Sequence, residues 1–355
     1  RVAFGKFIAS KVGADDKKTT GGFSHTPMDA LLAGYGAPNA GKQIGVVTIA
    51  GTIVDGEGGP GSAAGDTVAK QIYQALDQKD LKALVVRVDS PGGSVTASEK
   101  IRLAIAAAKE KKIPVIVSMA NLAASGGYWI SLPADVIFAE PSTITGSIGI
   151  FGVIPSVEAG LAKIGVNADG VKTTPLSGEP DFLGGFSPEF DRVAQSAIEN
   201  GYRDFVSRVA TARKKTPAEV DAIAQGRVWA GGAAKTRGLV DRIGGMDAAL
   251  AEAAKRAGLK ADGWHAVYIE PQPSFAGTLL GGLLPKRDAG AAPMDIFAQA
   301  AWQQQLFVAR MAADLDMLTS VQGIQARCLE CGDFGSAPVV RSDRGWLATL
   351  AKLLG

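Results

Sequence analysis

The chain has few of the residues from which most metal and acid–base sites are built. It contains two histidines, His25 and His265, and two cysteines among 355 residues. A Ser–His mechanism or a histidine-ligated metal site is therefore hard to assemble. Strong net charge is also lacking, because 37 basic residues balance 35 acidic ones, so no attraction to nucleic acid is implied. No run of about 18 apolar residues occurs, which argues against a transmembrane helix.

The first 42 residues lack the features of a secretory leader. The sequence begins with Arg1, and residues 1–42 contain no apolar stretch of about 7–15 residues after a basic start. We therefore expect a longer parent protein, whose anchor or export signal would lie upstream of Arg1. Residues 1–42 are rich in Gly, Lys, Asp and Thr and show little periodicity, which predicts a linker with one short helix near residues 27–33.

The sequence does contain a regular alternation of strand and helix patterns. Hydrophobic residues make up 46% and charged residues 20%, as in an ordinary globular protein. Short β-rich runs predict buried strands, and apolar residues at helical spacing predict helices between them. The predicted strands span residues 44–49, 84–88, 113–118 and 136–139, and the predicted helices span residues 67–76 and 96–109. This order predicts a largely parallel sheet covered by helices.

Helices dominate the prediction after residue 187. Ser187-Pro188 and Thr216-Pro217 each place a capping residue before a proline, which predicts one helix to about Lys215 and another beginning after Thr216. A third helix is predicted at 246–257. We thus divide the chain into a linker (1–42), a main domain (43–260) and an extension (261–355). The extension is expected to be a linker at 271–293 followed by a helical segment.

A glycine-rich motif, Asp89–Ser94 (DSPGGS), follows the second predicted strand and precedes a helix. Glycines at such a turn let backbone amides point into a cavity, where amides bind anions or a developing oxyanion. A tight turn that needs glycine for steric reasons alone is the alternative. The motif lacks the G-x-G-x-x-G spacing of a dinucleotide site and the lysine of a Walker loop.

A second motif, Ala123–Tyr128 (AASGGY), follows the third predicted strand. Ser125 would lie at a helix N-terminus, where the helix dipole stabilises negative charge on or near its oxygen. Small neighbours leave room for a substrate backbone, so the turn suits a nucleophile, although it lacks the G-x-S-x-G form. A helix-capping serine without chemistry is the alternative. Tyr128 and Trp129 are expected to pack beneath the site.

Three motifs in this order resemble those of the signal peptide peptidase A (protease IV) family of serine proteases. They are DSPGGSVTASE at 89–99, NLAASGGYWIS at 121–131 and PSTITGSIGIFGV at 141–153. The resemblance continues through IENGYRDFV at 198–206 and GRVWAGGAAKTRGLVD at 226–241, and it covers roughly residues 43–260. Chance similarity is implausible for three separate motifs in the same order.

This resemblance implies a Clp/crotonase-like α/β fold, here with a helical extension, and a serine endopeptidase with a Ser–Lys dyad. Ser125 matches the family nucleophile, and Gly93 and Gly126 lie where backbone amides would form the oxyanion hole. A lysine base agrees with the scarcity of histidine. The pKa of free lysine is about 10.4, so burial must lower it by roughly three units for catalysis near neutral pH. No metal or other cofactor is implied.

The chain offers no clear match for the family's lysine. In the short members that lysine follows the serine on a strand, and its position falls at about Pro175. Lys172 lies three residues earlier, and on a strand this offset reverses the face, so Lys172 is a weak alternative. Long members are tandem duplications whose N-terminal half carries the lysine, and residues 166–176 (VNADGVKTTPL) resemble their C-terminal half. We therefore expect the general-base lysine to lie outside this chain, in a lysine-bearing N-terminal half.

The resemblance also implies partners and a location. Its substrates would be cleaved signal peptides and other unfolded apolar peptides. Members form ring-like oligomers at the bacterial inner membrane with the active site facing the periplasm, so a homo-oligomer is expected there, without nucleic acid. Two other interpretations stay open, namely a crotonase-type acyl-CoA enzyme and a non-catalytic half that serves only assembly.

The two cysteines, Cys328 and Cys331, form a C-x-x-C outside the resemblance. Two cysteines without a nearby histidine do not complete a tetrahedral zinc site within one chain. A disulfide or two unpaired thiols are the main interpretations, and a metal site shared between chains is the other.

Overall fold

The computed structural model describes residues 2–15, 22–26, 41–58, 61–154, 156–260 and 263–270, together with the backbone of residues 325–327. Contacts divide the chain into two units, residues 1–41 and residues 42–355. The first unit contains helix α1 (Val2–Val12), where the sequence predicted only a linker. Phe4, Phe7 and Ile8 recur at helical spacing there, a signal that the polar, glycine-containing surroundings obscured. The helix predicted near residues 27–33 lies outside the described residues.

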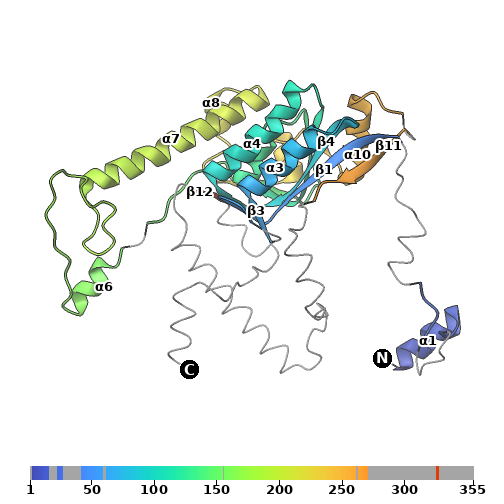
Figure 1. Cartoon of the computed structure of the whole chain (residues 1–355), viewed down its shortest axis with the longest axis horizontal. Coiled ribbons are helices and arrows are strands. Elements are labelled where there is room, and N and C mark those ends of the chain that lie inside the picture. The colour runs from blue at the N-terminus through green and yellow to red at the C-terminus, as the bar shows by residue number, and fades with distance from the viewer. Residues whose placement is uncertain are drawn as a thin grey trace. The chain divides into compact units, whose positions relative to one another are not determined.

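A parallel sheet forms the centre of the second unit (Figure 1). Its main path runs β10-β7-β6-β4-β1-β11, and every neighbouring pair along it is parallel. The strands are β1 (Lys42–Ala50), β4 (Leu81–Ser90), β6 (Val115–Ala124), β7 (Val136–Ala139), β10 (Arg242–Ile243) and β11 (Trp264–Tyr268). The α/β class expected from the sequence is confirmed. Strand β11 pairs with β1, so the sheet takes in residues beyond 260, where the main domain was expected to end.

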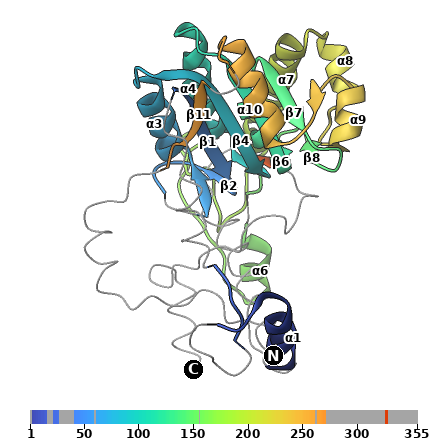
Figure 2. The ribbon, with the colours of Figure 1, turned by 90° about the vertical axis from the view of Figure 1, so that its right-hand side faces the viewer.

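Helices bury both faces of this sheet (Figure 2). Successive side chains of a strand point to opposite faces, so Val47 and Val86 join the larger core while Val46 and Val85 join the smaller one. Burial on both faces explains why the strands read as continuous apolar runs. The larger core is completed by α3 (Gly65–Leu76), α4 (Val95–Glu110), α5 (Gly126–Ser131) and α7 (Pro188–Arg213), and the smaller one by α10 (Met246–Arg256).

Capping residues begin the later helices as predicted. The Ser187 hydroxyl accepts a hydrogen bond from Phe190 N–H at 3.1 Å at the start of α7. Thr216 and Glu219 form a reciprocal capping box at the start of α8 (Pro217–Asp221). Helix α4 begins at Val95, one residue before the predicted start, because Ser94 is its cap and accepts from Ala97 N–H at 3.2 Å.

Short strands extend this framework around the two glycine-rich motifs. A second sheet has the order β12-β5-β2-β3, formed by β2 (Thr52–Val54), β3 (Ser62–Ala64), β5 (Gly92–Ser94) and β12 (Gln325–Arg327). Strand β8 (Ile144–Gly146) pairs with the end of β6 and with β9 (Val228–Ala230). Helix α9 (Gly231–Thr236) follows β9.

Residues 149–204, called the arm below, contain no buried residue among those described. The arm includes α6 (Glu158–Lys163) and most of α7. Residues 166–175 form no strand, contrary to expectation, and the Asn, Asp, Gly and Pro they contain all disfavour one. Within the described part of the chain, none of the helices has the length and apolar character needed to span a membrane.

Candidate active site

Ser125 occupies a sharp turn between β6 and α5. Its backbone has φ 53° and ψ −114°, a combination that is rare for a residue with a side chain. Both sides of the residue are fixed, because Ser125 N–H donates to Gly146 O at 2.8 Å and Ser125 O accepts from Trp129 N–H at 2.9 Å. Backbone strain of this kind is held in place by its surroundings and concentrates at functional sites.

The Ser125 hydroxyl is buried and has no hydrogen-bond partner. Among the described residues it is the one buried side-chain N or O atom left unpaired. Buried polar groups are paired in the great majority of cases, so this exception needs an explanation. The capping interpretation is not supported, because the Ser125 side chain makes no capping hydrogen bond at α5.

The predicted oxyanion glycines lie on the two elements that meet at this turn, because α5 and β5 are in contact. Gly93 has φ +154°, and a Cβ there would lie 1.9 Å from Ile53 O of β2. Glycine at 93 is thus required by the close approach of two backbones. Gly126 is the first residue of α5, where an amide has no acceptor within the helix. Their role as oxyanion donors stays a prediction.

Ser90 ties the DSPGGS motif to its neighbours. Its hydroxyl donates to Gly51 O at 2.7 Å and accepts from Gly92 N–H at 3.1 Å. A Cβ on Gly127 would lie 2.7 Å from Ser90 O, so the two glycine-rich motifs are in direct contact. Both motifs are recognisable in the sequence, but the hydrogen bonds of Ser90 to Gly51 and Gly92 were not predicted from it.

The third motif supports the strand that carries Ser125. The Thr143 hydroxyl donates to Ala120 O at 2.7 Å, and the Thr145 hydroxyl donates to Ala123 O at 2.7 Å. Both threonines are buried. In the sequence this motif serves only as part of the family resemblance, because the pairing of β8 with β6 that gives the two threonines their partners leaves no local pattern.

The aromatic residues after Ser125 have a packing role, as expected. Tyr128 and Trp129 are fully buried. Tyr128 OH donates to Leu239 O at 2.8 Å, and burial raises the pKa of this phenol. Trp129 Nε1–H donates to Glu99 Oε2 at 2.8 Å, and its ring packs on Phe205 of α7 with 4.6 Å between centroids. Helix α5 is thereby held against α4 and α7.

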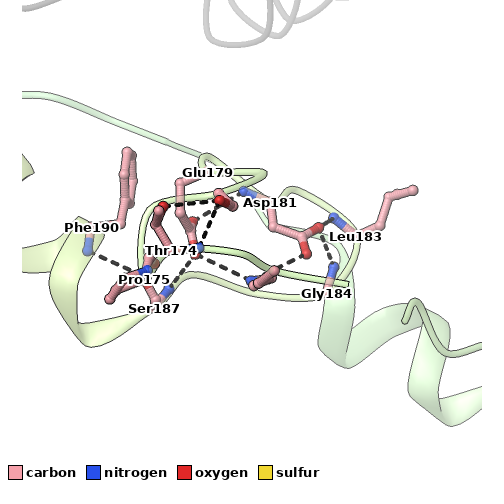
Figure 3. A network of polar contacts seen from close by, with 10 residues as sticks. Thr174, Pro175, Glu179, Asp181, Leu183, Gly184, Ser187 and Phe190 are labelled. Atoms are coloured by element: carbon pink, nitrogen blue, oxygen red, sulfur yellow. Dashed lines mark hydrogen bonds and ion pairs between the residues drawn. The ribbon is translucent and has the colours of Figure 1, made fainter. Parts of the chain in front are cut away.

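Lys172 is not brought to Ser125. It lies in a loop of the arm, where its Nζ is 3.4 Å from Glu179 Oε1 and 4.0 Å from Asp181 Oδ2. Glu179 also accepts hydrogen bonds from the backbone N–H groups of Asp181 and Ser187, so the loop is closed by its own contacts (Figure 3). The unpaired Ser125 hydroxyl therefore makes no hydrogen bond with Lys172.

Of the remaining candidates, the structure describes only the two histidines. Cys328 and Cys331 lie outside the described residues. His25 is exposed and its Nδ1 is 3.0 Å from Phe23 O, whereas His265 is buried on β11. No group of three or more His, Cys, Asp or Glu side chains that could hold a metal ion occurs in the described part of the chain.

The backbone of β12 runs along the strand that carries Gly93. It pairs with β5 in antiparallel orientation, with Ala326 opposite Gly93 and Arg327 opposite Gly92. The edge of β5 that faces away from β2 therefore accepts an extended chain as an added strand.

A buried, unpaired serine on a strained strand-to-helix turn of an α/β fold is the arrangement expected for the nucleophile of a serine hydrolase. The model of Peptidase family S49 matches residues 107–260. A putative protease of Synechocystis is 34% identical over 244 residues, which are 68% of this chain and 84% of that protein. The chain belongs to Peptidase family S49, whose members are serine peptidases.

Two longer relatives are more similar in sequence. Protease 4 of Salmonella typhi is 52% identical over 236 residues, 66% of this chain and 38% of that protein. Protease 4 of Haemophilus influenzae is 46% identical, over 64% of this chain and 36% of that protein. The chain thus spans little more than a third of the length of these two relatives.

Two solved structures were also matched, both at low sequence identity. ClpP1 from Listeria monocytogenes is 17% identical with a TM-score of 0.38, covering 58% of this chain and 94% of its own. A membrane-bound stomatin-specific protease is 15% identical with a TM-score of 0.40, covering 66% of this chain and all of its own.

Proposed function

We propose that this chain is the serine-bearing part of an endopeptidase that hydrolyses cleaved signal peptides and other unfolded apolar peptides with a Ser–Lys dyad. The observation that carries the proposal is the buried Ser125 hydroxyl, held on a strained turn and without a partner. A nucleophilic hydroxyl whose general base lies outside this chain would have these properties. The lysine would come from a second copy of the fold, in the same polypeptide or in a neighbouring one.

The reaction follows from the residues around the turn. Ser125 Oγ attacks the peptide carbonyl carbon while a neutral lysine takes the hydroxyl proton. The amides of Gly93 and Gly126 hold the oxyanion of the tetrahedral intermediate. The lysine then gives the proton to the leaving nitrogen as the C–N bond breaks, and water hydrolyses the acyl-enzyme by the same route.

Strand pairing at β5 favours a peptide substrate over an acyl-CoA. An extended chain lies antiparallel along β5, beside the glycine proposed to bind the oxyanion. Adding a strand to a sheet edge uses main-chain hydrogen bonds and so suits peptides of varied sequence. The crotonase-type interpretation would need a carboxylate at the reacting centre, and the Ser125 hydroxyl makes no hydrogen bond to one.

Labelling with a fluorophosphonate probe tests the dyad. We expect the full-length parent to be labelled and this chain alone to stay unlabelled, because its serine lacks a base. Ser125→Ala in the parent should abolish the label, read by intact-protein mass spectrometry. Labelling of the isolated chain that is lost in Lys172→Ala would contradict a base from outside. Failure to label either protein would favour the assembly or crotonase-type function.

We further propose that the protein assembles with copies of itself and that the arm takes part. Ten large apolar side chains of the arm are exposed, and none of the arm residues that the structure describes is buried. An exposed apolar surface of this extent marks an interaction site. The ten are Val153, Ile154, Val157, Ile164, Val166, Val171, Leu176, Phe182, Leu183 and Val193.

Substitution in the arm tests this assembly. Ile164 and Val171 are 73% and 96% exposed, so serine at both positions should cost the folded chain little stability. We expect the double variant to shift from an oligomer to a species of lower mass in light scattering after size exclusion. The control variant has serine at Tyr73 and Leu103, which are 47% and 50% exposed on α3 and α4. This variant should keep the oligomer. Equal masses for both variants would contradict a role of the arm.

The location is proposed from the family resemblance alone. We place the parent protein at the bacterial inner membrane with Ser125 facing the periplasm. Digestion of the domain by protease added to spheroplasts, but not to intact cells, would support this orientation. Protection in spheroplasts would contradict it.

A further inference from the structure

The strand that leads to Ser125 changes its pairing partner shortly before the turn. Residues 116–118 of β6 pair with β7, whereas residues 122–124 pair with β8. The register with β4 shifts at the same point, because Val88 faces Met119 but Ser90 faces Ala123. Asp89 is thus the one residue of β4 opposite the three residues 120–122, which form a bulge.

A bulge re-aims the strand that follows it and leaves backbone groups outside the ladder. In this bulge two backbone groups form hydrogen bonds with side chains. Asp89 Oδ1 accepts from Leu122 N–H at 3.2 Å, and the Thr143 hydroxyl donates to Ala120 O. The bulge therefore has a defined shape, and Ser125 follows it by three residues.

Asp89 is held on the other side by the neighbouring strand. Its own carbonyl accepts from Gly51 N–H at 2.9 Å, at the end of β1. The side chain is half-buried, and burial raises the pKa of Asp89, whereas the hydrogen bond from Leu122 and the charge of Arg87 lower it. Burying a carboxylate costs free energy, so an aspartate at this half-buried position points to a role beyond packing.

We propose that Asp89 is a positioning residue for the nucleophile, which sets the path of residues 120–124 through its hydrogen bond to Leu122 N–H and so aims the Ser125 hydroxyl. The inference deepens the proposed function, but the hydrogen bond and the bulge do not depend on it. Asp89 touches no reacting atom in this role. It acts through the backbone of β6.

The test compares three variants of the full chain. Asp89→Ala removes the acceptor, whereas Asp89→Asn keeps an oxygen that can accept from Leu122 N–H. The matched control is Asp135→Ala, because Asp135 Oδ2 accepts from Val115 N–H at 2.8 Å at the opposite end of the same strand. Both alanine variants remove one carboxylate-to-amide hydrogen bond from β6.

The first measurement is hydrogen exchange, which requires no activity. We expect Asp89→Ala to raise exchange about tenfold at residues 120–125 and to leave residues 115–118 unchanged. Asp135→Ala should raise exchange at 115–118 instead, and Asp89→Asn should remain close to the wild type. Unchanged exchange at 120–125 in Asp89→Ala would overturn the proposal.

The second measurement is kinetic and uses the parent protein. We expect kcat for peptide hydrolysis to fall about 100-fold in Asp89→Ala with KM little changed, because a small displacement of a nucleophile affects chemistry more than binding. Asp89→Asn should recover most of that loss. A loss no larger than that of Asp135→Ala would overturn the proposal. If the wild-type parent shows no activity, the proposed function fails, and the exchange measurement alone decides the role of Asp89.

Discussion

Ser125→Ala is expected to abolish peptide hydrolysis by the parent protein and, at the same time, to raise the stability of the folded chain. The loss of kcat should be at least about 10⁴-fold, because the nucleophile acts as a unit with its base. Stability should rise because the wild-type hydroxyl is buried without a partner, at a cost of about 1 kcal/mol or more. Active-site groups often lower the stability of the fold because their positions serve activity.

Ser125→Gly should stabilise the chain further. The backbone angles of residue 125 strain any residue with a Cβ, and glycine adopts them freely. Relief of that strain should exceed the entropy that glycine loses on folding, which leaves a gain of about 1 kcal/mol over Ser125→Ala. Urea unfolding of the chain, with an unchanged slope, measures both variants.

Ser131→Ala provides the matched control on the same helix. Ser131 is also fully buried, but its hydroxyl donates to Gly127 O at 2.8 Å. Alanine there should therefore lower the free energy of unfolding by about 1 kcal/mol. If Ser125→Ala lowers stability as Ser131→Ala does, the Ser125 hydroxyl is paired in the folded chain, and the case for a missing base is lost.

The fold was predictable because its strands are buried on both faces. Mostly apolar, β-rich runs such as 84–88 and 113–118 indicate buried strands without any knowledge of pairing. The caps of α7 and α8 were predictable for a related reason, because a cap depends on residues a few positions apart. Each of these signals is local in the sequence.

The parts of the site that escaped prediction depend on pairing between distant residues. Asp89 reads as one residue of a glycine-rich turn until the shift between β4 and β6 places it opposite the bulge. Thr143 and Thr145 acquire their role only when β8 pairs with β6. Register between strands distant in sequence leaves no local pattern, which explains why Ser125 could be proposed as a candidate from its motif and its supports could not.

The assessment of Lys172 from the sequence depended on a strand that the structure does not contain. Lys172 was judged by its offset on an expected strand, but residues 166–175 form a loop and Lys172 faces acidic residues of the arm. The strand assumed for Lys172 is absent, although Lys172 also makes no hydrogen bond with Ser125 in the structure.

Gly93→Ala is expected to destabilise the chain by about 3 kcal/mol or more and to abolish labelling of Ser125 in the parent protein. The added Cβ would lie 1.9 Å from Ile53 O and under 3.0 Å from Ile53 N and C. These are backbone atoms, so no change of rotamer relieves the overlap, and β5 must move away from β2. The positive φ of residue 93 adds strain to the overpacking. Movement of β5 displaces the amide proposed to bind the oxyanion.

Gly160→Ala separates this effect from the general cost of replacing glycine. Gly160 lies in α6, and a Cβ there would meet nothing within 4 Å. Alanine should be neutral or stabilising by up to about 1 kcal/mol, because it favours the helix. Thermal unfolding of both variants, followed by probe labelling of the fraction that remains folded, measures the two effects. A Gly93→Ala chain with wild-type stability would show that β5 does not rest on β2, and a stable variant that still labels would remove Gly93 from the oxyanion hole.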